Sequence, residues 1–186
     1  LFVCHTCGCF DPFWVGDKPY SKVVYSHELY NVGHLYEAAA AYYQATGKRT
    51  LLDIAIKNAR HVNRVFFEGD PAYNDGKPVM QAPGHEEIEL ALVKIYRTTG
   101  QEKYLDFANW LLEERGHGHG SMGGEGKWDP AYYQDVIPVR ELTDISGHAV
   151  RCMYLYCGMA DVAALKKDTA YVEALNRLWD LSLIHI

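Results

Sequence analysis

Apolar and polar positions along this chain repeat with the period of an α-helix, in pairs of segments that occur three times. The first members of the pairs read "VGHLYEAAAAYYQATG" from Val32, "PGHEEIELALVKIYRTTG" from Pro83 and "SGHAVRCMYLYCGMADVAAL" from Ser146. A short polar turn follows each one, and the second members begin in "KRTLLDIA", "QEKYLDFA" and "KKDTAYVEAL". The pattern predicts three αα-hairpins, each made of a helix, a turn and a second helix.

The second helices share one apolar stripe. Tyr104, Leu105, Ala108, Leu111 and Leu112 correspond to Tyr171, Val172, Leu175, Leu178 and Trp179. In the first hairpin, the same spacing is followed by Leu51, Leu52, Ala55 and Ala59. Asn58 is the one polar residue within this stripe. A single stripe at this spacing predicts a helix with one face in water.

The first helices are apolar around most of their circumference, which predicts burial on most sides. Alternating inner and outer helices are typical of a closed α/α toroid whose inner helices line a central cavity. Three hairpins make about half of the version with six hairpins, so we expect an all-α fold forming about half of an (α/α)6 barrel. An open solenoid of hairpins fits the periodicity almost as well.

Composition narrows the function classes. The chain has 186 residues, 48% of them hydrophobic, and a formal net charge of −6, which suits one globular domain. Because no cluster of lysine and arginine occurs, nucleic acid and membrane are not expected partners. The five cysteines are odd in number and unevenly placed, which favours a reducing, cytoplasmic compartment over a disulfide framework. Cys152 and Cys157 are predicted to lie in the core.

A Gly-His pair stands at the head of each first segment, giving His34, His85 and His148. We therefore expect the three imidazoles at one end of the bundle. A neutral ring offers one hydrogen-bond donor and one acceptor, so it can bind a sugar hydroxyl or ligate a metal. The simpler alternative is that Gly-His only closes a loop before each helix.

Carboxylates crowd the same segments: Glu28, Glu86, Glu87, Glu89, Glu141 and Asp144. Glycoside hydrolysis uses a pair of such groups across the scissile bond. First-turn glutamates are also favoured by the helix dipole alone, and this alternative stays open for Glu86 and Glu87. Loop aromatics that suit stacking on sugar rings are Trp14, Tyr73, Trp128, Tyr132 and Tyr133.

Two short stretches contain possible metal ligands. "CHTCGC" near the start has ligand types that zinc accepts, but no matching second half follows it. "HGHG" at 117–120 has the glycine content of a flexible loop tip. We expect this chain to bind no metal.

The long motifs "SHELYNVGHLYEAAAAYYQATGKRTLLDIAIKNA", "PGHEEIELALVKIYRTTGQEKYLDFANWLLEERG" and "PVRELTDISGHAVRCMYLYCGMADVAAL" resemble glycoside hydrolase family 127, the β-L-arabinofuranosidases. The resemblance implies an (α/α)6-barrel catalytic domain followed by β-sandwich domains. It implies a retaining glycosidase that releases terminal β-linked L-arabinofuranose, with a cysteine nucleophile in a zinc site and a glutamate acid/base. By motif, the family's sugar-contacting histidines fall on His34, His85 and His148.

The resemblance covers residues 11–180 as a partial barrel domain; residues 1–10 do not resemble the family, and 181–186 look like an artefactual tail. The family's Glu-x-Cys and Cys-Cys motifs, which hold the zinc in a full-length parent, do not occur in this chain. We therefore expect a wall that binds an arabinofuranose-containing glycan, no catalytic residue, and no turnover by this chain alone.

Two alternatives to the glycosidase reading stay open. One is an α/α-barrel sugar epimerase or lyase that uses histidine as acid and base. The other is a helical-repeat interaction module without catalysis. A half barrel also leaves inner faces such as Tyr42, Val93 and Tyr154 without partners, so we expect homo-oligomers or aggregation.

Overall fold

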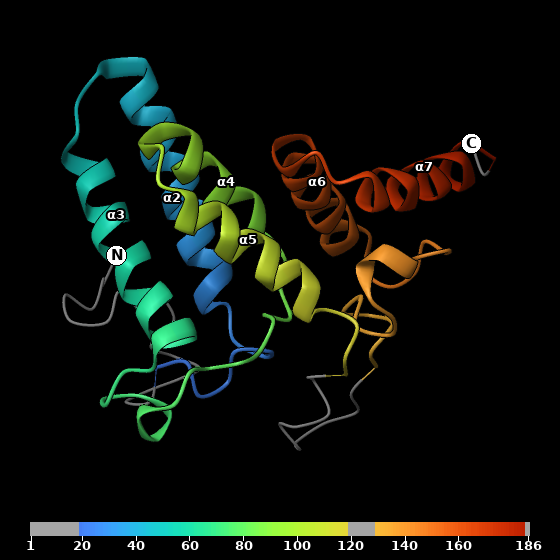
Figure 1. The fold of residues 1–186 in the computed structure, drawn as a ribbon, viewed down its shortest axis with the longest axis horizontal. Helices are drawn as coiled ribbons and strands as arrows, with labels where there is room; N and C mark the ends of the chain where they lie inside the picture. The colour runs from blue at the N-terminus through green and yellow to red at the C-terminus, as the bar shows by residue number, and fades with distance from the viewer. Residues whose placement is uncertain (1–18, 119–128, 185–186) are drawn as a thin grey trace.

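The computed structural model describes residues 19–118 and 129–184, and six α-helices in three hairpins dominate this part of the chain (Figure 1). The hairpins are α2 (Glu28–Thr46) with α3 (Thr50–Asn63), α4 (Ile88–Thr99) with α5 (Glu102–Glu114), and α6 (Ala149–Lys166) with α7 (Thr169–Ile184). Short helical turns follow at η1 (Arg64–Glu68), η2 (Asn74–Gly76) and η4 (Val139–Glu141). The predicted all-α class and the three hairpins are confirmed.

Each first helix ends at a residue in the left-handed conformation. Gly47 and Gly100 both have φ of 69°, and their N–H groups donate to the carbonyls of Tyr43 and Tyr96. Lys167 takes the same role in the third hairpin with φ of 57°. Since only glycine adopts this conformation without strain, the Thr-Gly pairs account for where α2 and α4 stop.

The first helices form a row with α4 in the middle. α4 packs against α2 on one side and α6 on the other, and each first helix packs against the second helix of its own hairpin (Figure 1). The outer helices α3, α5 and α7 therefore cover an inner row of α2, α4 and α6. This arrangement is the partial α/α barrel that the periodicity predicts.

Position in the row decides how deeply an inner helix is buried. α4 has neighbours on both sides, and Ile88 to Val93 are all buried. α2 and α6 lie at the ends of the row, so Tyr42, Val150 and Met153 are exposed. The expectation of burial on most sides thus holds for α4 alone. Two further expectations were wrong: Val93 is fully buried, and Cys157 is exposed while Cys152 is in the core.

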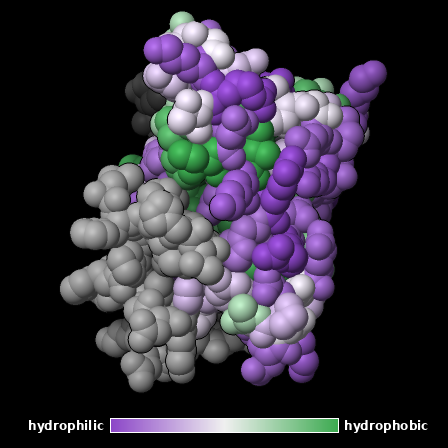
Figure 2. Space-filling model, turned by 90° about the vertical axis from the view of Figure 1, so that its left-hand side faces the viewer, coloured by the Kyte–Doolittle hydropathy of each residue, from purple (hydrophilic) through white to green (hydrophobic). Residues whose placement is uncertain are grey.

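The outer helices bury the predicted stripe in α3 and α5. Asn58, its one polar member, is buried because the hydroxyl of Tyr36 donates to Asn58 Oδ1 over 2.7 Å. In α7 the stripe is only half buried: Val172 and Trp179 are exposed because no described helix packs against that face. From the α3 side, the visible surface of the described residues is mostly hydrophilic, and its main hydrophobic area lies in the upper half of the view (Figure 2).

Several sequence predictions lie outside the described residues, namely those for Cys4, Cys7, Cys9, Trp14, Trp128, His119 and the 1–10 end. None of the described helices combines the length and the apolar character that crossing a membrane requires.

Candidate functional site

The three predicted histidines occupy different positions relative to their helices. His148 is the N-cap residue of α6, and His85 lies in the loop three residues before α4 begins at Ile88. His34 lies inside α2, which already begins at Glu28. The expectation that all three open a helix was therefore wrong for His34, because the residues before Val32 continue the helix.

The glycine of each Gly-His pair permits a close approach between segments. A Cβ atom on Gly33 would lie 2.8 Å from Cγ of Glu87, and one on Gly84 would lie 1.9 Å from the carbonyl oxygen of Val24. Gly147 has φ of 78°, and a Cβ there would lie 2.1 Å from the carbonyl oxygen of Ala131. Since real Cβ atoms do not come this close to neighbouring atoms, these glycines allow each histidine-bearing segment to pack closely against another part of the chain.

His34 and His85 flank one tyrosine. The ring of Tyr30 lies 4.5 Å from that of His34 and 6.0 Å from that of His85, measured between centroids. The ring of His27 lies 3.9 Å from that of His85, again measured between centroids. Tyr154 from α6 lies 6.2 Å from both Tyr30 and His34. The first two predicted histidines thus belong to one aromatic cluster.

His148 joins this cluster through Tyr132 and Arg151. The ring of Tyr132 lies 5.4 Å from that of His148, and the guanidinium of Arg151 lies 4.6 Å from the centre of the Tyr132 ring. Arg151 in turn donates to Nε2 of His85 over 2.7 Å and to the carbonyl oxygen of Gly84 over 2.7 Å. The structure therefore connects all three histidines in a row of touching side chains.

The contact with Arg151 fixes the role of each nitrogen in the His85 ring. Because a guanidinium only donates, Nε2 of His85 accepts and the proton of the neutral ring is on Nδ1. Nδ1 of His85 is buried and has no hydrogen-bond partner among the described residues, and the same holds for Nδ1 of His148. Buried polar atoms without partners are rare in folded proteins, so the surroundings of these two nitrogens are incomplete in the described part of the chain.

Burial lowers the pKa of His85 to about 3, and the positive charge of Arg151 and the neighbouring His27 add to the effect. His85 is therefore uncharged at neutral pH. A general acid or base works best with a pKa near the operating pH, so this ring is better suited to hydrogen bonding than to proton transfer.

The carboxylates around the start of α4 are buried. Arg115, at the end of α5, is fully buried and pairs with Glu86 at 3.1 Å and with Glu89 at 3.2 Å. Burial raises the pKa of Glu86 to about 7, although the charge of Arg115 opposes the rise. The helix dipole alone does not require such burial, so these glutamates hold the loop before α4 against α5.

Glu87 is buried as deeply, and burial together with the charge of Glu89 raises its pKa to about 8. Its Oε1 lies 3.4 Å from Nδ1 of His34, and Oε2 of Glu37 lies 3.7 Å from the same nitrogen. The three side chains have ligand atoms within 4.8 Å of one another, a spacing that a metal ion would fit. However, the ammonium of Lys94 contacts Glu37 and places a positive charge there, so the residues present do not suit zinc.

The other predicted carboxylates do not join the cluster. Glu28 is buried, and its carboxylate accepts hydrogen bonds from the N–H of Tyr20 and the hydroxyl of Ser26, which is a structural role. Glu141 and Asp144 are exposed. Burial also raises the pKa of Cys152, whose thiol donates to the carbonyl oxygen of Ala149. This is the opposite of what activates a cysteine nucleophile.

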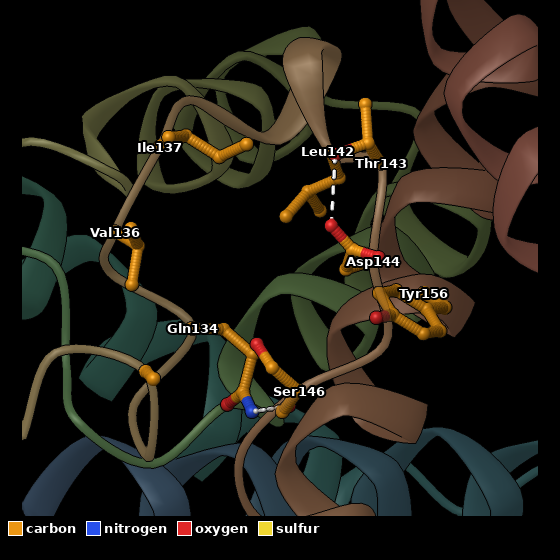
Figure 3. Close-up of a pocket in the computed structure, with 9 residues that line it drawn as sticks. Gln134, Val136, Ile137, Leu142, Thr143, Asp144, Ser146 and Tyr156 are labelled. Atoms are coloured by element: carbon orange, nitrogen blue, oxygen red, sulfur yellow. Dashed lines mark hydrogen bonds between the residues drawn. The ribbon is translucent and has the colours of Figure 1, made fainter.

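A pocket of about 280 Å³ lies between the loop before α6 and α6 itself (Figure 3). Gln134, Asp144 and Tyr156 supply polar groups, and the rest of the lining is mainly apolar. Gln134 spans the loop by donating to the carbonyl oxygen of Ser146 (Figure 3). None of the three predicted histidines lines this pocket, so it is separate from the histidine row.

Comparison with known proteins agrees with this architecture. Residues 10–183 match the family described as "Beta-L-arabinofuranosidase, GH127 catalytic domain". The chain belongs to this family. A curated relative, the non-reducing end β-L-arabinofuranosidase of Bifidobacterium longum subsp. longum, is 36% identical over 179 residues.

Solved GH127 structures have the same fold. The β-L-arabinofuranosidase Ara127N-Se from Geobacillus stearothermophilus T6 is 39% identical over 89% of this chain, with a TM-score of 0.80. The GH127 β-arabinofuranosidase BT3674 is 43% identical over 90% of this chain, with a TM-score of 0.77. The chain spans about a quarter of the length of these relatives, 26% of the curated protein and 27% and 24% of the two structures.

Sequence reasoning missed the residues that hold the histidines in place. Arg115 and Arg151 anchor the loops around His85, and Tyr30 joins His34 to His85. One signal was present in the sequence: Arg151 is a charged residue within the otherwise apolar start of α6. Buried charges are rare unless they are paired, so such a residue predicts a specific partner.

Proposed function

We propose that this chain forms the histidine wall that binds L-arabinofuranose in a GH127 β-L-arabinofuranosidase, with His34, His85 and His148 contacting the sugar. The observation that carries the proposal is the continuous row of contacts His34, Tyr30, His85, Arg151, Tyr132 and His148. Aromatic rings provide apolar faces for a furanose, and neutral imidazoles provide donors and acceptors for its hydroxyl groups.

In a protein as long as its relatives, the reacting groups come from beyond this chain. We propose a retaining glycosidase whose cysteine nucleophile, zinc ligands and acid/base glutamate lie in the rest of that protein. When bound, zinc would activate the cysteine as a thiolate. The present chain contributes no Glu-x-Cys or Cys-Cys motif. Its own residues bind and orient the sugar, and alone it should not turn over substrate.

One observation argues against the epimerase or lyase alternative. A histidine acid or base at neutral pH needs a pKa near 7, whereas burial and Arg151 lower the pKa of His85 to about 3. The interaction-module alternative gives no reason why histidines of three successive hairpins are joined in one row of aromatic contacts. Binding of a sugar accounts for both features.

The test uses a full-length protein that contains this chain, with an aryl β-L-arabinofuranoside as substrate. Replacing His85 with Ala should raise KM or lower kcat/KM by about 10–100-fold while leaving measurable hydrolysis, because a binding contact is lost and the nucleophile is not. Complete loss of chemistry with unchanged sugar affinity would support the acid/base alternative instead. Release of the aryl group by the 186-residue chain alone would contradict the assignment of the reacting groups elsewhere.

The exposed faces at the end of the row suit the same proposal. Val150, Met153 and Cys157 form an exposed stripe on α6, and Val172 and Trp179 are exposed apolar residues on α7. We propose that the next hairpin of the longer protein covers them. The chain by itself should therefore self-associate, as an exposed apolar face favours.

A further inference from the structure

Glu87 is a buried acid at this end of the bundle that, unlike its neighbours Glu86 and Glu89, forms no ion pair with arginine among the described residues. Its side chain has no exposed area, and neither carboxyl oxygen has a hydrogen-bond partner in the described part of the chain. Its neighbours Glu86 and Glu89 both face Arg115. Burying a polar group without a partner is costly, so the position of Glu87 calls for an explanation.

Helix α2 leaves room for the side chain of Glu87. A Cβ atom on Gly33 would lie 2.8 Å from Cγ and 3.2 Å from Cδ of Glu87. A glycine inside a helix weakens it, because the backbone loses more freedom on folding. Gly33 therefore makes room for Glu87 beside the next residue of α2, which is His34.

The charges around the pair favour two neutral groups. Burial, with the charge of Glu89, raises the pKa of Glu87 to about 8, and burial, with the charge of Lys94, lowers the pKa of His34. An ion pair between the two groups would shift each pKa in the opposite direction. At neutral pH the contact is thus between a carboxylic acid, which can donate, and an imidazole nitrogen, which can accept.

The remaining groups that face this contact do not change that conclusion. Glu37, one turn after His34 in α2, lies 3.7 Å from the same nitrogen, but its other oxygen is held by Lys94. Tyr154, from α6, has a pKa raised by burial and by its neighbours Tyr30 and Glu87, so its hydroxyl is neutral. Glu87 is therefore the carboxyl group free to bond His34.

We propose that Glu87 is a positioning residue for His34: its buried carboxyl group donates to Nδ1 and so keeps the ring in the tautomer that carries its proton on Nε2. Nε2 is then a donor for a ligand oxygen, while the side chain of His34 stays 40% exposed and accessible. The 3.4 Å between Oε1 and Nδ1 needs to shorten by only a few tenths of an ångström to reach the usual bond length. The proposal that His34 donates to a sugar rests on the proposed function, whereas the proposal about its tautomer does not.

The direct test is a two-bond ¹H–¹⁵N NMR spectrum of the ligand-free chain with ¹⁵N-labelled histidine. The signal of His34 is assigned by its loss in His34→Asn. We expect the proton on Nε2 and an unprotonated Nδ1 at pH 7. A proton on Nδ1 would overturn the proposal.

Three variants distinguish positioning from packing. Glu87→Gln keeps a donor at the same place and should preserve the tautomer, whereas Glu87→Leu should give a mixture of both tautomers. Glu37→Gln is the matched control, since it alters the other carboxyl group near Nδ1 and should leave the tautomer unchanged. An unchanged spectrum in Glu87→Leu, with the fold retained by circular dichroism, would overturn the proposal, as would the loss of the tautomer in Glu37→Gln alone.

A second readout connects the tautomer to function. In the full-length protein, Glu87→Leu should weaken binding of L-arabinose by about ten-fold, the effect of losing one oriented hydrogen bond, and Glu87→Gln should restore most of it. Equal affinities for L-arabinose in Glu87→Leu and in the unsubstituted full-length protein would overturn the functional part of the inference. Absence of sugar binding in the parent would overturn the proposed function, while the tautomer test would still stand by itself.

Discussion

The two ends of the inner helices are built in different ways. Where α2, α4 and α6 end, the chain turns in water: Gly47 and Gly100 have positive φ, and a Cβ on either would meet nothing within 4 Å. At the histidine end, Gly33 and Gly84 are required by contact, since a Cβ on either would lie within 3 Å of a neighbouring atom. The turns require glycine for its left-handed backbone conformation, whereas the histidine end requires glycine because a side chain would not fit.

Charge follows the same division. The ion pair beside the first turn, Arg49 with Asp53, is more than half exposed on both sides. The pairs of Arg115 with Glu86 and Glu89 are almost fully buried. Burial of ionisable groups costs stability, and proteins retain such groups mostly at functional sites. The difference separates a closely packed histidine end with buried charges from turns that lie in water, which is consistent with the binding role proposed for the histidines.

The largest expected effect comes from breaking the buried charge network. Arg115→Leu leaves Glu86 and Glu89 buried without their cation, so unfolding free energy should fall by about 3–5 kcal/mol. Arg49→Leu, at the turn end, should change it by at most about 1 kcal/mol, because exposed pairs contribute little. Urea denaturation of both variants measures the two values; equal losses would remove the contrast between the ends.

A pair of glycine substitutions compares the ends again. Gly84→Ala places a Cβ 1.9 Å from the carbonyl oxygen of Val24, so it should cost about 1–3 kcal/mol and shift the NMR signals of His85. Gly47→Ala meets no atom and strains only its own backbone, which costs about 1–2 kcal/mol. The histidine spectrum is the sharper readout. A shift of the His85 signals in Gly47→Ala, or none in Gly84→Ala, would contradict the assignment.

Stability should fall as the pH rises from 6.5 to 8. The pKa values of Glu86 and Glu87 are raised to about 7 and 8, above the ordinary value of glutamate, so the folded chain holds protons that the unfolded chain has lost. The stability that these two acids contribute is fully present below their pKa in the unfolded chain. It is lost as the pH rises through their pKa values in the folded chain. His85, with its lowered pKa, opposes this trend only below about pH 6.5.

The expected slope is about 1.4 kcal/mol per pH unit for each proton that differs between the two states. Urea denaturation at several pH values measures it, and Glu87→Gln should flatten the upper part of the curve. A stability that stays constant or increases between pH 6.5 and 8 would contradict the raised pKa values of these acids in the folded chain.

The smallest effect is expected far from the histidines. Trp179 is 64% exposed, so Trp179→Ser should change the unfolding free energy by no more than about 0.5 kcal/mol. It should, however, reduce self-association in sedimentation experiments, because it removes the largest side chain of the exposed apolar face. Unchanged association would place the self-association surface elsewhere.

The hairpins could be predicted from sequence because a helix and its stop are local properties. The Thr-Gly pairs and the stripe of α5 were sufficient for this. Burial of Val93 and exposure of Trp179 were not predictable, since they depend on which helix lies in the middle of the row. Likewise, Gly-His indicated that His85 matters, but only the fold shows Arg151 bonded to its ring.

In the proposed function, His34, His85 and His148 form one binding surface, which can be tested by NMR titration of the ¹⁵N-histidine-labelled chain with methyl β-L-arabinofuranoside. The signals of these three histidines should move together along one binding curve, while those of His61 and His117, which lie outside the row, should stay still. Separate curves for the three histidines, or movement of His117 alone, would contradict it.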